Sequence, residues 1–120
     1  MRVSVELNKA AIAALEKAAK EAAVATGESL REDLINSKTM PFDTGTMQND
    51  NTFVENRENG AVIVTSSAQA RRLYYHPEYN FQKGKNPNAG AQWFEPYISG
   101  DKKDFAPQVF KDEFKKRSGL

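Results

Sequence analysis

The sequence has no cysteine and only one histidine, His76, among its 120 residues. The lack of cysteine excludes disulfide bonds, thiol catalysis and every zinc site that depends on cysteine ligands. A lone histidine without a nearby nucleophile motif is a weak basis for catalysis or metal binding, and we interpret His76 as a packed or hydrogen-bonding residue. Phosphate-loop, dinucleotide and calcium-loop motifs are also missing. The sequence therefore predicts neither a cofactor nor a metal site.

Charge of one sign and long hydrophobic runs are scarce as well. The chain has seventeen Lys and Arg residues and sixteen Asp and Glu residues, for a net charge of +1. This balance indicates no dedicated polyanion partner. The alanine-rich stretch 10–25 contains four charged residues and is too polar to span a membrane. Residues 1–12 lack the apolar core and cleavage site of a signal peptide. We expect one domain, with no membrane contact, that stays in a cytoplasm or in whatever is assembled there.

Helical periodicity is what the first third of the chain does have. Asn8 is placed to cap a helix over about residues 8–36, which would be about 40 Å long. Its apolar or small residues recur every three or four positions, at Ile12, Leu15, Ala19, Ala22, Thr26, Leu30 and Leu34. A globule of this size is only roughly 30 Å across, so the helix should extend past its core. Either it lies across its own sheet, which we favour, or part of its stripe packs on a neighbouring subunit.

The rest of the chain predicts a small antiparallel sheet and a second helix. A turn over 40–46 leads into a hairpin over about 51–66, centred on Asn-Gly, a pair that favours the tight turn of a hairpin. The aromatic segment 68–98 should begin with a helical turn, continue into a third strand or extended stretch, and include an exposed, mobile loop at 82–92. Phenylalanines at helical spacing predict a helix over about 104–117. This order indicates an α+β domain.

The stretch "MPFDTGTM" contains Asp-Thr-Gly, the triplet of dimeric retropepsin-like aspartic proteases. In those enzymes two copies bring together two aspartates that share a proton, so one triplet per chain would be sufficient. Here, however, the triplet follows a helix exit and a proline rather than a buried strand. We favour a structural turn formed by Pro41, Asp43, Thr44 and Gly45, in which Pro41 fixes the backbone, Asp43 accepts hydrogen bonds from nearby amides, and Gly45 supplies conformational freedom. Catalysis by Asp43 remains the alternative.

Arg71 and Arg72 stand beside several tyrosines in "ARRLYYHPEYNF". Cations among stacking aromatics suit a small nucleic-acid-binding module, but Tyr and Arg are also enriched where proteins bind one another. Because the net charge is close to zero, we favour a protein–protein interface.

Taken in order, "MPFDTGTM", a hairpin, "ARRLYYHPEYNF", "NPNAG", "WFEPYI" and a basic helix with phenylalanines resemble a known family. The chain resembles the minor capsid proteins of long-tailed phages of Gram-positive bacteria, within the wider neck (tail-completion, head–tail connector) family. The resemblance covers about residues 8–117. It departs from the family at Ala68-Gln69, where Pro-Tyr is expected before Ala-Arg-Arg.

The resemblance implies a virion structural protein with no catalysis. Copies would form a ring at the head–tail interface, between the head-completion (adaptor) proteins and the tail terminator or tail tube, and would leave a channel through which DNA passes as cargo. Assembly would take place in the host cytoplasm. On this interpretation the overlong helix packs against neighbours in the ring, and loop 82–92 becomes ordered on meeting a partner. The candidate interface residues are Arg71, Arg72, Tyr74, Tyr75, Trp93, Phe94 and Tyr97.

Overall fold

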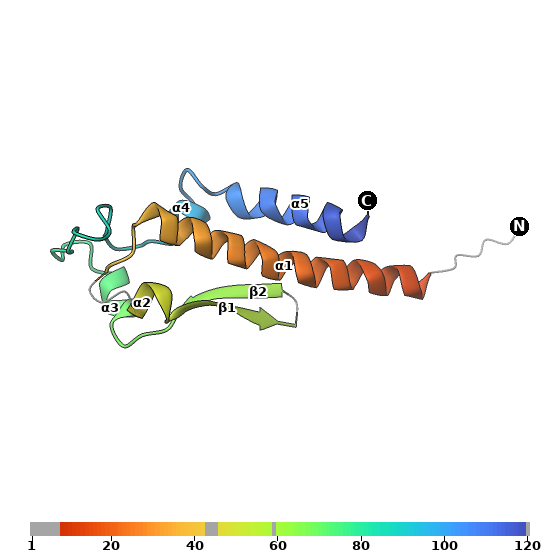
Figure 1. Ribbon diagram of the computed structural model, residues 1–120, viewed down its shortest axis with the longest axis horizontal. Helices are drawn as coiled ribbons and strands as arrows, with labels where there is room; N and C mark the ends of the chain where they lie inside the picture. Colours follow the sequence, from red (N-terminus) through yellow and green to blue (C-terminus); the bar gives the residue numbers. More distant parts are fainter. Residues whose placement is uncertain (1–7, 43–45, 59, 120) are drawn as a thin grey trace, which may run out of the picture.

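The computed structural model describes residues 8–42, 46–58 and 60–119. Its elements in chain order are α1 (Lys9–Ser37), α2 (Thr46–Asn49), β1 (Thr52–Arg57), β2 (Gly60–Thr65), α3 (Ala70–Tyr74), α4 (Glu95–Ile98) and α5 (Phe105–Ser118). Figure 1 shows α1 along the length of the molecule, with the hairpin on one side and α5 on the other. The predicted α+β class is confirmed, and the hairpin and both long helices lie within about two residues of their predicted bounds.

The first helix begins and ends with the caps that its sequence provides. The Asn8 side chain accepts a hydrogen bond from the Ala11 N–H at 3.1 Å, as predicted for an N-cap. At the other end Lys38 adopts the left-handed conformation, with φ of 57°, and its N–H donates to the Ile35 carbonyl. In the part of the chain that the structure describes, neither α1 nor any other helix combines the length and apolar character needed to cross a membrane.

Burial along α1 is uneven. Its buried residues are Ala18, Ala22, Thr26 and Leu34, three of which belong to the predicted stripe. The first turns are exposed throughout, including Ile12 and Leu15 at the start of the stripe. In Figure 1 this end of α1 extends past both the hairpin and the end of α5. The helix therefore lies across its own sheet over its second half and outruns the core over its first turns.

The sheet consists of one antiparallel hairpin in the described residues. Its register pairs Thr52 with Thr65 and Arg57 with Gly60, while residue 59 of the predicted turn lies outside the described residues. Of the predicted third strand or extended stretch, the strand is wrong, because no strand follows α3 in residues 75–119. Pro77 has no N–H to donate, and the chain beyond it forms local turns instead of a ladder.

The hydrophobic core lies at the far end of α1 from its exposed first turns. Leu34, Met40 and Trp93 form its buried centre, and partly buried side chains surround them: Met47, Ile63, Leu73, Tyr74, Phe94 and Tyr97. The centre therefore joins the end of α1, the segment that follows it and the start of α4. Thr52 is buried here with its hydroxyl satisfied, since it donates to the Met47 carbonyl at 2.8 Å.

The loop 82–92 is not simply an exposed, mobile loop, which corrects the prediction. Asn86 and Ala89 are buried. Two backbone hydrogen bonds tie the loop to the end of α1, from Asn88 N–H to the Lys38 carbonyl at 3.2 Å and from Gly90 N–H to the Thr39 carbonyl at 3.0 Å. The polar composition marks a loop correctly, but its backbone N–H groups bond to the two residues that follow α1, and the Asn88 side chain donates to the Ser37 carbonyl at the helix end.

At Gly27 the backbone of α1 lies close to the sheet. A Cβ atom on Gly27 would lie 2.8 Å from Cγ1 of Val54 on β1. Alanine at this helical position should gain about 1 kcal/mol of helix propensity, but crowding against a stiff β-branched side chain costs about 1–3 kcal/mol. We expect Gly27→Ala to lower the free energy of unfolding by about 1 kcal/mol in urea titrations.

The partner substitution provides the control. In a Val54→Ala background the crowding is gone, so Gly27→Ala should raise the free energy of unfolding, a coupling of at least about 1 kcal/mol in the double-mutant cycle. If Gly27→Ala changed the free energy of unfolding equally in both backgrounds, positions 27 and 54 would not be coupled and the crowding would be absent.

Candidate functional site

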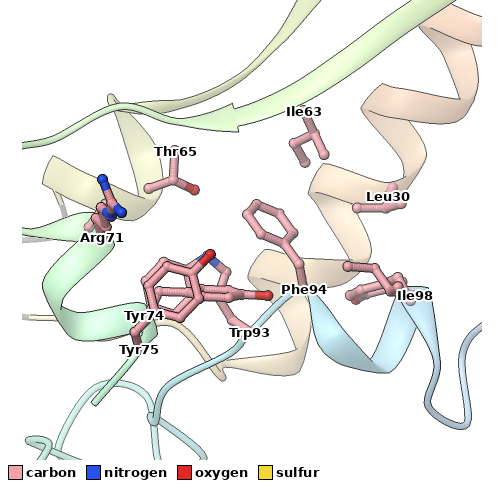
Figure 2. Close-up of a pocket in the computed structure, with 11 residues that line it drawn as sticks. Leu30, Ile63, Thr65, Arg71, Tyr74, Tyr75, Trp93, Phe94 and Ile98 are labelled. Atoms are coloured by element: carbon pink, nitrogen blue, oxygen red, sulfur yellow. The ribbon is translucent and has the colours of Figure 1, made fainter. Parts of the chain in front are cut away.

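An aromatic pocket of about 610 Å³ lies between α1, β2, α3 and α4 (Figure 2). The residues that line this aromatic pocket are Leu30, Ile63, Thr65, Ala70, Arg71, Tyr74, Tyr75, Trp93, Phe94, Tyr97 and Ile98. Six of the seven residues proposed as an interface from the sequence are among them. Arg72, the seventh, does not line the pocket.

Two short helices and the residues directly beside them supply most of the pocket. In α3, the Ser67 hydroxyl accepts a hydrogen bond from the Ala70 N–H at 3.1 Å, and Ala70 is buried. This fixes the orientation of the helix, so that Arg71 lies at the pocket and its exposed neighbour Arg72 does not. The chain returns beside α3 at Gln92, whose N–H donates to the Tyr74 carbonyl at 3.1 Å. That bond places Trp93 and Phe94 against α3.

Tyr74 is at the centre of the aromatic packing. Its ring meets the rings of Trp93 and Tyr75 edge-on, with centroids 4.8 Å and 5.2 Å away, and lies 6.0 Å from Phe94. Figure 2 shows the Phe94 ring extending toward Ile63 on the strand. Burial and the nearby Glu95 carboxylate raise the pKa of Tyr74, so its hydroxyl stays neutral. Aromatic pairs in these arrangements contribute about 0.5–1.5 kcal/mol each to stability beyond their burial, and so they stabilise the wall of the pocket.

Trp93 forms the floor of the pocket and is 2 % exposed. Its indole Nε1 is buried and has no hydrogen-bond partner among the described residues. Burying a donor in this way costs about 1–3 kcal/mol. Among the described residues the indole is held by packing, against Met40, Leu34 and Tyr74.

A polar cluster fixes α4 to α1 at one side of the pocket. The Tyr97 hydroxyl donates to Oδ2 of Asp33 at 2.6 Å, and the Lys102 ammonium donates to the same oxygen at 2.9 Å. The Lys102 nitrogen also lies 5.3 Å from the centre of the Tyr97 ring. The Tyr97 hydrogen bond, together with Lys102, lowers the pKa of Asp33, whereas burial and the Asp33 carboxylate raise the pKa of Tyr97.

These pKa shifts predict a loss of stability in acid. Because the pKa of Asp33 is lowered in the folded state, its contribution is complete above the pKa of an unfolded aspartate, about 3.9, and is lost as the pH falls through the lower folded value. We expect Asp33→Asn to cost about 1 kcal/mol at pH 7, a modest amount because these side chains are partly exposed. Urea titrations from pH 7 to pH 2 should show that the variant loses less stability in acid than the parent.

The matched control is Asp50→Asn, which changes an exposed aspartate after α2. It should leave both the stability at pH 7 and the acid dependence close to those of the parent. An Asp33→Asn variant with the parental pH profile would contradict the assignment.

The remaining predicted residues lie away from the pocket. Pro41 is half-buried, while Asp43, Thr44 and Gly45 of the predicted turn lie outside the described residues. His76 makes a hydrogen bond and packs against a ring, as predicted. Its Nδ1 lies 2.6 Å from Oε1 of Glu78, and this hydrogen bond lowers the pKa of the Glu78 carboxyl. The His76 ring stacks on Tyr79. In residues 8–42, 46–58 and 60–119 no three His, Asp or Glu side chains are grouped to hold a metal ion.

Comparisons of the chain with models of protein families, with curated proteins and with solved structures give no significant match.

Proposed function

We propose that the chain is a virion structural protein of the head–tail connector (neck) of a long-tailed phage. In this role copies form a ring between the head-completion proteins and the tail terminator or tail tube, and the ring leaves a channel for DNA. The chain acts by holding its neighbours together and carries out no catalysis. Its place is the head–tail interface of the virion, reached after assembly in the host cytoplasm.

The observation that carries the proposal is where the motifs of the resemblance lie. "ARRLYYHPEYNF", "NPNAG" and "WFEPYI" are spread over about thirty residues of sequence. The first supplies α3, the second bonds to the end of α1, and the third supplies Trp93 and α4. Together they form one end of the molecule, and that end has an open aromatic pocket. Aromatic side chains around a concave surface are typical of protein interfaces, which supports a binding role.

The two alternatives have less support. A retropepsin-like enzyme requires its Asp-Thr-Gly after a buried strand, whereas residues 38–42 continue from the end of α1 without forming one. A nucleic-acid-binding module would use several cations beside the stacking rings. At this pocket Arg71 is the single cationic residue among those that line it.

The test is quantitative mass spectrometry of gradient-purified particles from an induced culture of the source strain. We expect the chain at a few copies per particle, far below the major shell protein. Deleting its gene should leave filled heads and finished tails that do not join, and the gene supplied in trans should restore joining. Complete, infectious particles that lack the chain would reject the proposal.

A further inference from the structure

The aromatic pocket has an open rim. Tyr75 and Ile98 lie there with 63 % and 66 % of their surfaces exposed, although both are large apolar side chains. Leu30 of α1 and Ile63 of β2 line the same pocket. A concave, mainly apolar site of a few hundred Å³ is the kind of surface that receives apolar side chains of a partner.

The opposite end of the molecule presents a projecting apolar face. Ile12 and Leu15 are 40 % and 38 % exposed on the first turns of α1. They are three residues apart and so lie on one face of the helix, among alanines that leave them prominent. An apolar pair at this spacing is the anchor pattern of a helix that binds in a groove.

The pocket cannot receive this face from its own chain. Ile12 and Leu30 belong to the same uninterrupted helix, and eighteen residues of helix separate them by about 27 Å. Only a second copy can bring Ile12 and Leu15 to the pocket.

We propose that the first turns of α1 of one copy bind in the aromatic pocket of the next copy. The charges agree with this pairing, because Glu16 stands next to Leu15 and Arg71 lines the pocket. The two surfaces differ, so a pair of copies still has one free surface of each kind, and repetition closes a ring or extends a filament. As a contact within the ring this inference rests on the proposed function, whereas the association itself is tested without particles.

The contact is small, since the projecting face offers two large side chains, and association in solution is expected to be weak. The absence of cysteine from the sequence allows weak contacts to be trapped by engineered disulfides. We would mix Leu15→Cys protein with Ile98→Cys protein under mild oxidation and measure the rate of the mixed disulfide. Disulfides require Cα atoms within about 7 Å, so a fast reaction reports the proposed contact.

The matched control is Lys17→Cys mixed with Ile98→Cys. Lys17 lies on the same exposed turns of α1, but on the opposite face from Ile12 and Leu15 by helical geometry. We expect Leu15→Cys to react at least about tenfold faster than Lys17→Cys, a ratio that corresponds to a tenfold higher local concentration. Equal rates would overturn the proposal.

A second measurement does not depend on disulfide chemistry. Sedimentation velocity at high protein concentration should show self-association of the parent that is lost in Leu15→Asp and reduced in Arg71→Glu, but retained in Lys17→Asp and Arg72→Glu. All four positions are exposed, and circular dichroism verifies folding. Association that persists in Leu15→Asp would overturn the proposal and indicate another contact, such as pairing along a free strand edge of the hairpin. If copies associate as proposed but particles lack the chain, the proposed function fails and this contact stands.

Discussion

Replacing Trp93 with alanine should lower the free energy of unfolding by about 3–5 kcal/mol, the range found for large aromatic side chains removed from a packed core. Trp93 is among the buried residues that unite the end of α1, the chain after it and α4. Its loss would leave Leu34, Met40 and the Tyr74 ring without a partner on one side. Urea titration followed by far-UV circular dichroism measures the change, since the only tryptophan is removed.

Two further substitutions separate packing from other effects at this position. Trp93→Phe keeps an aromatic ring and removes the Nε1 donor that has no partner among the described residues, so its cost should stay below about 2 kcal/mol. Tyr75→Ala changes an exposed ring of the same cluster and should cost less than about 1 kcal/mol. A Trp93→Ala protein as stable as the Tyr75→Ala protein would show that the pocket has no packed floor.

The sequence predicted the elements whose signals are local. The period of α1, its Asn8 cap and the hairpin all depend on residues close together in the chain, and all three are confirmed. The predicted third strand is not formed, because a strand must pair with the edge of another strand, and no local pattern reveals whether such an edge is available. Ala18 is buried on α1 although it lies outside the predicted stripe, because α1 packs against α5 as well as against the hairpin.

The candidate site was predicted as a set of residue types and not as a shape. Aromatic residues near Arg71 and in "WFEPYI" were singled out, and the fold gathers them around one pocket. Leu30 and Ile63, which also line that pocket, could not be found, because nothing in the sequence places them beside the aromatic residues of "WFEPYI", at least thirty positions away. The choice between Arg71 and Arg72 likewise depends on Ala70 being the buried face of α3.

The two ends of α1 differ in how far the rest of the chain covers them. At the C-terminal end, the carbonyl groups of Lys38 and Thr39 accept hydrogen bonds from loop 82–92, and the core lies directly beneath. At the N-terminal end, Asn8 caps the helix but no described element covers its apolar face. One end is therefore closed within the chain, whereas the other has the exposed apolar face that we propose binds a second copy.

Replacing Asn86 with aspartate should destabilise the protein by about 3 kcal/mol or more at pH 7. Asn86 is 4 % exposed, and its side-chain nitrogen donates to the Met40 carbonyl at 2.8 Å and to Oε1 of Gln48 at 2.7 Å. In the variant a carboxylate oxygen would face two acceptors at these distances, and burying its charge costs further free energy. Gln48 can turn its amide to donate, but the Met40 carbonyl cannot. Urea titration at pH 7 gives the change in stability.

The pH dependence identifies the cause. Burial should raise the pKa of the introduced carboxyl in the folded state, so the destabilisation is smallest below about pH 4 and grows as the pH rises through the raised folded value. Asn80→Asp makes the same chemical change at an exposed site and should cost less than about 0.5 kcal/mol at any pH. An Asn86→Asp protein that matches this control would mean that the loop is not held through its buried amide. The predicted loss of stability would show that "NPNAG" holds the loop against the end of α1. The loop in turn positions Trp93, the floor of the aromatic pocket.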